Sequence, residues 1–181
     1  MNLKLIIGII AFLCIGNSSE DDTISWNENR KLTWADFKDQ PNLNSGAVAL
    51  TASGITFGFS IQKSGGRPTS FNTTVESLFY PDKSWYIEER ADNYILGHEQ
   101  LHFDITELHA RKFRQQISRL KVSSRIRSEL NRLHTSINRA SVAMQSKYDK
   151  ESNHSIIKEA QLRWQKYIAI ELKKLERFKS Q

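Results

Sequence analysis

Cysteine is almost absent from this sequence of 181 residues, because Cys14 is the only one. Cys14 lies inside an apolar segment near the N-terminus, and removal of that segment would leave the mature chain without a thiol. The mature chain then has no disulfide, no zinc ribbon and no cysteine nucleophile. Any metal ion that it binds must be held by histidine, aspartate or glutamate.

Long hydrophobic runs are absent as well. The longest run extends from Leu5 to Ile15, follows Lys4 directly, and is succeeded by a polar stretch that begins at Asn17. A membrane-spanning helix needs about twenty apolar residues, so we expect no permanent membrane span. The pattern is typical of a signal peptide, which we assign to residues 1–18.

The signal peptide predicts an exported protein. A lipoprotein would be modified at Cys14, but Leu13 occupies the position where a small residue is expected. Export without disulfides suits a bacterial periplasm or exterior better than a eukaryotic secretory pathway. We therefore expect a periplasmic or secreted bacterial protein.

Proline and glycine are scarce in the second half of the chain. All three prolines precede Arg90, and Gly97 is the only glycine after it. The first half is interrupted often and contains β-branched and aromatic segments, which predict short strands. The expected strands are residues 47–53, 55–62, 73–80 and 84–88, with the second and third paired antiparallel across the Gly65-Gly66 turn.

The second half has the apolar periodicity of helices. One helix is expected from an N-cap at Asp92 or Asn93 to about Leu120, and a second from 122 to about 148. A polar break at 149–154 precedes a third helix. The predicted fold is α+β, a small N-terminal antiparallel sheet followed by three long helices, in one domain of residues 19–181.

One segment of the first long helix has the pattern His-Glu-x-x-His, formed by His98, Glu99 and His102. The spacing of four residues puts both imidazoles on one helix face, within reach of a single Zn²⁺ ion. Glu99 lies about 100° around the helix and can approach a metal-bound water as a general base. The pattern therefore predicts a zinc site with hydrolytic chemistry.

A third metal ligand has to come from elsewhere in the chain. His109 lies about 10 Å along the helix from His102, too far to share the ion, and is expected in the core or beside a ligand. Glu107 points about 180° away from His98 and is expected to be solvated or to face the sheet.

The polar break before the last helix offers the best candidates for the third ligand. His154 is the first choice, because a neutral imidazole is a good zinc ligand and a loop can direct it toward the first helix. Asp149 is next, as a ligand or as a partner that orients a histidine, followed by Glu151. Tyr148 is a candidate catalytic residue that donates its phenolic proton to a developing oxyanion.

Several stretches of the chain resemble a family of exported bacterial proteins of unknown function that are regarded as zinc-dependent proteases of the zincin type. The resemblance rests on segments spread over nearly all of the mature chain: Leu32-Thr33-Trp34-Ala35-Asp36-Phe37, Ser84-Trp85, His98-Glu99-Gln100-Leu101-His102-Phe103-Asp104 with Glu107 and Arg111, and Tyr148-Asp149 with His154, Gln161 and Trp164. It implies a metallopeptidase with a zincin-like metal helix, acting on a peptide or protein substrate that lies along an edge strand.

Three functions remain open at this stage. The leading one is a zinc-dependent metallopeptidase, with His98, His102 and His154 as ligands and Glu99 as the base. The second is a non-catalytic exported module that binds a metal or contacts the envelope. The third is a basic binder of anions, since the formal net charge is +6 and basic residues cluster between Arg111 and Arg139. Phe113 is the only Phe, Tyr or Trp in that cluster, so no nucleic acid is expected as a partner.

Overall fold

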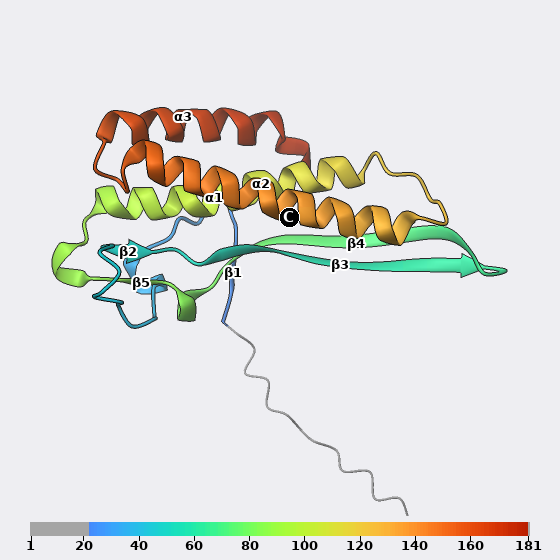
Figure 1. Ribbon diagram of the computed structural model, residues 1–181, viewed down its shortest axis with the longest axis horizontal. Coiled ribbons are helices and arrows are strands. Elements are labelled where there is room, and N and C mark those ends of the chain that lie inside the picture. Colours follow the sequence, from blue (N-terminus) through green and yellow to red (C-terminus); the bar gives the residue numbers. More distant parts are fainter. Residues whose placement is uncertain (1–21, 181) are drawn as a thin grey trace, which may run out of the picture.

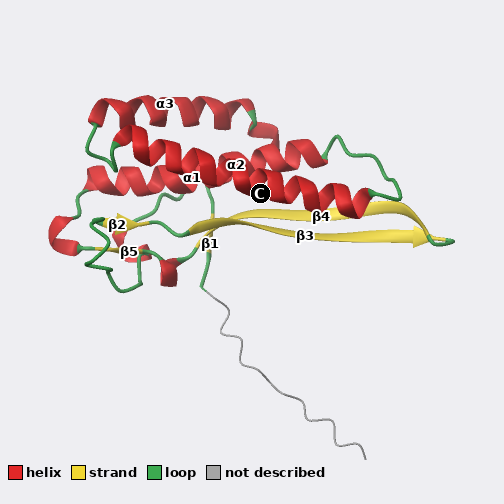
Figure 2. Cartoon of the chain, viewed as in Figure 1, coloured by secondary structure: helices red, strands yellow, loops and turns green. Residues whose placement is uncertain are grey.

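The structure is a computed structural model that describes residues 22–180. The chain folds as α+β, with a small antiparallel sheet followed by three helices that cover one face of it (Figures 1 and 2). This architecture confirms the predicted fold class. The predicted signal peptide, residues 1–18, lies outside the described residues. Within the part of the chain that is described, no helix combines the length and apolar character needed to cross a bilayer.

The sheet is dominated by one long hairpin. Strand β3 (Ser53–Ser64) pairs antiparallel with β4 (Arg67–Phe79), and the short β1 (Ile24–Ser25) lies on the other side of β4. The turn places Gly65 and Gly66 at φ +55° and +79°, a left-handed conformation that glycine adopts without steric cost. The antiparallel pairing of these strands confirms the prediction, and β4 begins earlier than expected.

A second, two-stranded sheet is smaller than the sequence predicted. Strand β2 (Ala49–Leu50) pairs antiparallel with β5 (Trp85–Tyr86). The expected strands at 47–53 and 84–88 are therefore correct in place but too long. The short 3₁₀ turns Pro81–Lys83 and Glu88–Arg90 limit β5 on both sides.

Three helices follow the sheet: α1 (Asn93–Ile117), α2 (Ile126–Ser152) and α3 (Lys158–Lys174). Helix α1 begins where the sequence predicted, because the side chain of Asp92 accepts a hydrogen bond from the N–H of Ile95 at 2.8 Å. Helix α2 begins and ends later than predicted. The residues expected to form a polar break, 149–152, are its last turn.

The end of α2 is set by backbone conformation, not by polarity. Asn153, His154 and Ser155 all have positive φ, at 47°, 50° and 71°. Asparagine tolerates this left-handed region better than other non-glycine residues, so Asn153 can terminate the helix. Polar residues such as Asp149 and Glu151 are compatible with a helix, which is why polarity alone misplaced the boundary.

Apolar side chains from all of these elements form the core. One cluster joins the hairpin to α1 and α2 through residues such as Val75, Phe113 and Leu130. A second joins the three helices through Leu101, Ile105, Tyr148, Trp164 and Ile168, and a third holds the N-terminal segment through Trp26, Leu32, Phe37, Phe79 and Phe103. Helix α1 contributes to all three clusters, so the residues of its exposed turns are held in fixed positions.

Candidate metal centre

Two imidazoles on α1 converge at the surface of a cleft. His98 and His102 are one turn apart, and their Nε2 atoms are 3.2 Å from each other. Leu101 and Ile105 on the neighbouring face are buried against α3, which fixes the rotation of the helix. The spacing read from the sequence therefore produces the expected pair of ligand atoms.

The third group is Asp149, in the last turn of α2. Its Oδ1 atom is 3.2 Å from His98 Nε2 and 2.9 Å from His102 Nε2. These three atoms form a triangle whose sides are close to the distance of about 3.3 Å between ligand atoms around a tetrahedral ion with bonds of 2.0–2.1 Å. Among the described residues, this is the one cluster of histidine, cysteine and carboxylate groups with the geometry to hold a metal ion.

A glutamine on α2 orients His102. Gln145 Oε1 lies 2.6 Å from His102 Nδ1, so the ring donates its Nδ1 proton there and leaves Nε2 as the free lone pair. The Nε2 amide of Gln145 donates to the His102 carbonyl at 2.9 Å, which fixes the amide. This arrangement prepares His102 Nε2 to bind a cation. The sequence analysis did not identify Gln145. Gln145 lies one turn before Asp149, so a predicted second helix that continued through Asp149 would have placed both side chains on the same helix face.

The electrostatics of the three groups show a strong mutual interaction. Burial acts to raise the pKa of Asp149, but its polar and electrostatic interactions with His102 and His98 together outweigh burial and hold that pKa well below its usual value. Burial acts to lower the pKa of His102, but the hydrogen bonds to Asp149 and Gln145 and the negative charges of Glu99 and Asp149 together outweigh it, so that this pKa is raised. The carboxylate favours a positive charge between the two rings, as a cation would supply.

Glu99 lines the same cleft, and its carboxylate is available for chemistry there. Its side chain is buried, but no hydrogen bond or ion pair among the described residues uses its carboxylate. The carboxylate is close enough to His102 to contribute to the raised pKa of that ring. Its backbone carbonyl accepts a hydrogen bond from Thr51 Oγ at 3.3 Å, which ties α1 to the segment after β2.

The cleft has a volume of about 850 Å³. One wall is the segment 45–53, which contains β2, and the floor is the first half of α1 with His98, Glu99 and His102. The last turn of α2 and the loop 153–156 close the other side. This volume is in the range of sites that bind small molecules or short peptides.

His154, the first choice for the third ligand, does not belong to the cluster. Its Nδ1 atom is 3.9 Å from Asp149 Oδ1, and its side chain is 77% exposed at the rim of the cleft. Asp149, the second choice, takes the place expected for His154, because α2 continues through position 149 and carries the carboxylate to α1. Glu151 points elsewhere, since its carboxylate accepts a hydrogen bond from Trp164 Nε1 at 2.8 Å.

Tyr148 lies beneath the imidazoles. Its ring stacks on His98, with centroids 4.5 Å apart, and the side chain is fully buried in the core between the helices. Burial raises the pKa of its hydroxyl, so the phenol stays protonated. The predicted donation of a proton to an oxyanion requires a hydroxyl in the cleft, and the structure does not place it there.

The other polar residues of α1 serve the core. His109 is buried, its Nδ1 donates to the carbonyl of Ile105 at 2.9 Å, and burial lowers its pKa, which agrees with the expected core position. Glu107 is fully buried and paired with Arg111 at 2.9 Å, so the expectation of a solvated carboxylate is wrong. The arginine's guanidinium supplies the compensating charge that the sequence alone did not show.

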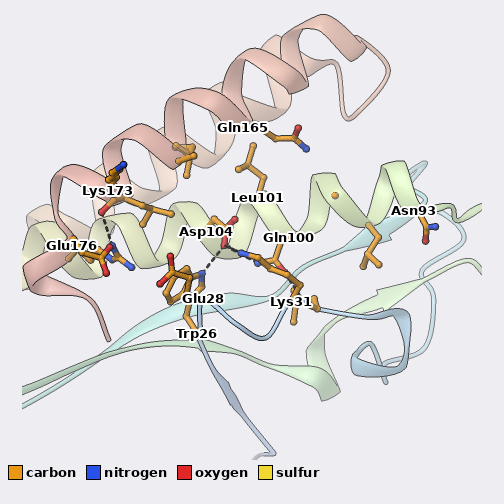
Figure 3. A pocket seen from close by; sticks show the side chains of 17 residues that line it. Trp26, Glu28, Lys31, Asn93, Gln100, Leu101, Asp104, Gln165, Lys173 and Glu176 are labelled. Atoms are coloured by element: carbon orange, nitrogen blue, oxygen red, sulfur yellow. Dashed lines mark hydrogen bonds and ion pairs between the residues drawn. The ribbon is translucent and has the colours of Figure 1, made fainter. Parts of the chain in front are cut away.

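A second cavity on a different side of α1 explains two further residues near the motif. It has a volume of about 860 Å³ and lies between the N-terminal segment, α1 and α3 (Figure 3). Asp104 accepts hydrogen bonds there from Trp26 Nε1 at 2.7 Å and from Gln100 Nε2 at 2.9 Å, and Gln100 Oε1 accepts from the N–H of Leu32. Gln100 and Asp104 therefore anchor the N-terminal segment to α1.

A protein-family model matches the part of the chain that contains this site. The model of a family of bacterial proteins of unknown function, DUF922, matches residues 24–155. The chain belongs to this family. The match contains the whole candidate metal centre, including Asp149, and ends before α3. Comparisons with curated proteins and with solved structures gave no significant match. Because the function of DUF922 is unknown, membership assigns no reaction.

Proposed function

We propose that this DUF922 protein is an exported zinc-dependent hydrolase that cleaves peptide bonds. The observation that supports this most directly is the triangle of His98 Nε2, His102 Nε2 and Asp149 Oδ1 at the floor of a cleft. Three protein ligands leave the fourth position of a tetrahedral ion open to water or substrate, which distinguishes catalytic zinc sites from closed structural ones.

The donor set favours zinc over the harder cations. Two imidazole nitrogens suit zinc and other transition metals, whereas calcium and magnesium prefer sites made of oxygen atoms. Bound Zn²⁺ would supply a Lewis acid and a water of lowered pKa at the floor of the cleft. Gln145 keeps His102 in the tautomer that such an ion needs.

Glu99 is the proposed general base. It lines the cleft with the two histidines, and no described residue holds its carboxylate in a hydrogen bond or ion pair. In this role Glu99 accepts a proton from the attacking water and then delivers it to the amine of the departing peptide fragment, which balances the proton over the reaction.

The edge of β2 is the proposed support for an extended substrate. The N–H of Ile87 donates to the carbonyl of Val48 at 2.8 Å, and Ala49 is paired with Tyr86. Bonding alternates along an antiparallel pair, so the N–H and carbonyl of Ala49 point away from β5. Ala49 lines the cleft, and its free backbone groups can pair with a peptide main chain.

The substitution Glu99→Gln tests the proposal. It keeps the size of the side chain and removes the base, so zinc content should stay near one ion per chain. General-base catalysis contributes typically about 10²–10⁴-fold, and peptide hydrolysis should fall by that factor. Zinc is measured by atomic absorption, and cleavage is measured with a fluorogenic peptide library and with unfolded proteins.

Glu89→Gln is the matched control, because it makes the same chemical change at an exposed carboxylate before α1. It should leave zinc content and turnover unchanged. Equal cleavage by wild type and Glu99→Gln would contradict the assigned base. A zinc-loaded wild type that cleaves nothing in the library would instead favour the non-catalytic metal-binding module.

A further inference from the structure

The two long strands of the hairpin have outer edges that differ sharply. The outer edge of β4 is occupied: the carbonyl of Val75 accepts two hydrogen bonds from Arg114, at 2.8 and 3.1 Å, and the carbonyl of Ser77 accepts one from the N–H of Trp26 at 2.9 Å. Pro68 also removes an N–H near the tip of β4. These are ordinary ways in which proteins protect a strand edge.

The outer edge of β3 has no such protection. Strand β3 is the terminal strand of its sheet, and among the described residues no hydrogen bond from outside the hairpin reaches its backbone. The segment from Ser53 to Gln62 contains no charged residue, in a chain of which 25% is charged. A long, uncharged edge rich in β-formers pairs readily with another strand.

The apolar face of β3 is incompletely covered in a single chain. Ile55, Phe57, Phe59 and Ile61 face the core formed with α1 and α2, but all four remain only partly buried, whereas Val75 on β4 is buried. Helix α2 reaches this row, since Arg127 lies 5.1 Å from the ring centroid of Phe59 and the rings of His134 and Phe57 are 5.1 Å apart, yet the four side chains keep part of their surface exposed. A further strand beside β3 would extend the apolar row and cover it.

The sequence of β3 identifies which strand fits. Residues 55–61 read Ile-Thr-Phe-Gly-Phe-Ser-Ile, which is nearly the same in both directions about Gly58. An antiparallel copy with its two-fold axis at Gly58 would set Phe57 opposite the partner's Phe59 and Ile55 opposite the partner's Ile61. Thr56 would face the partner's Ser60 on the other side of the sheet. Apolar residues thus meet apolar ones, polar residues meet polar ones, and no charges are opposed.

We propose that two copies of this chain pair antiparallel along β3, with Gly58 on the two-fold axis, and form one continuous sheet. The helices of both copies then lie on the same face of that sheet. Glycine is unfavourable within a strand, and in the single chain a side chain at position 58 would meet nothing within 4 Å. Packing inside one chain therefore gives no reason for glycine at this position, and a side chain introduced there can test the proposed axis. This inference is independent of the proposed hydrolase activity.

Charged residues introduced along β3 test whether the dimer forms in the proposed register. In the proposed register, Thr56→Lys with Ser60→Lys opposes two pairs of like charges, whereas Thr56→Lys with Ser60→Glu opposes two pairs of opposite charges. Within the hairpin, position 56 faces Glu76 in both variants, so the lysine there is equally well accommodated. Sedimentation equilibrium should give a dimer for wild type, at least about tenfold weaker association for the Lys/Lys variant, and recovery for the Lys/Glu variant.

Asn72→Lys with Thr74→Lys is the matched control, since it adds two lysines to the same face of β4, one strand away from the proposed interface. This variant should remain dimeric. Circular dichroism establishes that every variant is folded. A wild type that stays monomeric up to about 100 μM, or a folded Lys/Lys variant that associates as well as wild type, would overturn the proposal.

Disulfide cross-linking tests the register in the full chain with Cys14→Ser. Directly opposed residues of an antiparallel pair have Cα atoms about 4.5–5.5 Å apart, within the range of a disulfide. Gly58→Cys should therefore form covalent dimers on mild oxidation. Ser60→Cys should not, because the two copies of position 60 are offset by four residues, about 13 Å. Cross-linking of Ser60→Cys but not of Gly58→Cys would overturn the register and the placement of Gly58 on the two-fold axis.

Discussion

Helix α1 carries two clusters of charged or titratable groups that differ in how fully they are satisfied. In its first half, His98, Glu99 and His102 face a cleft, and the only carboxylate between the two rings is that of Asp149. In its second half, Glu107 is fully buried and accepts hydrogen bonds from Arg111 Nε at 2.9 Å and from Ser180 Oγ at 2.8 Å. Both clusters lie on one continuous helix, the first beside α2 and the second beside the C-terminal segment.

The two clusters differ in whether their charged and polar groups are compensated within the chain. Glu107 is surrounded by donors from Arg111, Arg114 and the C-terminal segment, so its charge is compensated within the chain. At the metal centre, lone pairs of two rings and a carboxylate are directed at one another without enough protons to bond them all. Such a cluster of acceptors has the geometry to hold a cation.

The largest loss of stability is expected from removal of the buried carboxylate of Glu107. Glu107→Ala leaves the guanidinium of Arg111 buried without its carboxylate, and loss of one partner of a buried ion pair costs about 3–5 kcal/mol of unfolding free energy. Urea denaturation monitored by tryptophan fluorescence would measure it. The control is Glu176→Gln, which removes a half-exposed partner of Arg111 and should reduce stability much less than Glu107→Ala. Equal losses in the two variants would contradict the structural role of Glu107.

A smaller change in free energy is expected at the candidate metal centre, where it concerns zinc binding. Asp149→Ala removes one of three ligand atoms and should weaken zinc affinity more than about 100-fold, beyond what loss of a supporting hydrogen bond costs. His154→Ala is the matched comparison, because its exposed ring lies outside the triangle, and it should change affinity by less than about tenfold. Competition with a chromogenic chelator measures both. The reverse order of effects would make His154 the ligand.

The sequence was sufficient for the features that depend on local periodicity. The helical stripe and the capping aspartate Asp92 predicted α1 correctly, and the spacing of His98 and His102 predicted that their imidazoles lie together. The glycine pair at the hairpin turn predicted the pairing of β3 with β4. Each of these follows from interactions within a few residues, which a sequence displays directly.

Features that depend on where two distant elements meet were not predictable in this way. The choice between Asp149 and His154 depended on whether α2 stops before or after position 149, a boundary set by the left-handed conformation of Asn153. The burial of Glu107 depends in part on Ser180, which reaches it from a position that no short-range pattern connects. Gln145 was missed for the same reason, because its partner His102 lies on another helix.

The smallest expected effect contrasts two histidines of α1. The pKa of His102 is raised, whereas burial lowers that of His109 below its ordinary value of about 6.5. The unfolded chain therefore protonates His109 before the folded protein does. As the pH falls below about 6.5, His109 should reduce stability, by at most about 1.4 kcal/mol per pH unit, until the pH reaches the folded pKa.

The variant His109→Phe isolates this contribution, because it keeps a ring of similar size in the core and removes the titrating group. Urea unfolding of metal-free protein at pH 7.5 and 5.5 measures the free energy of unfolding of both chains. His102 and Asp149 titrate alike in the two proteins, so their effects cancel in the difference. Wild type should lose more stability than His109→Phe on acidification. An equal loss would mean that His109 titrates in the folded protein as it does in the unfolded chain, despite its burial and its bond to Ile105.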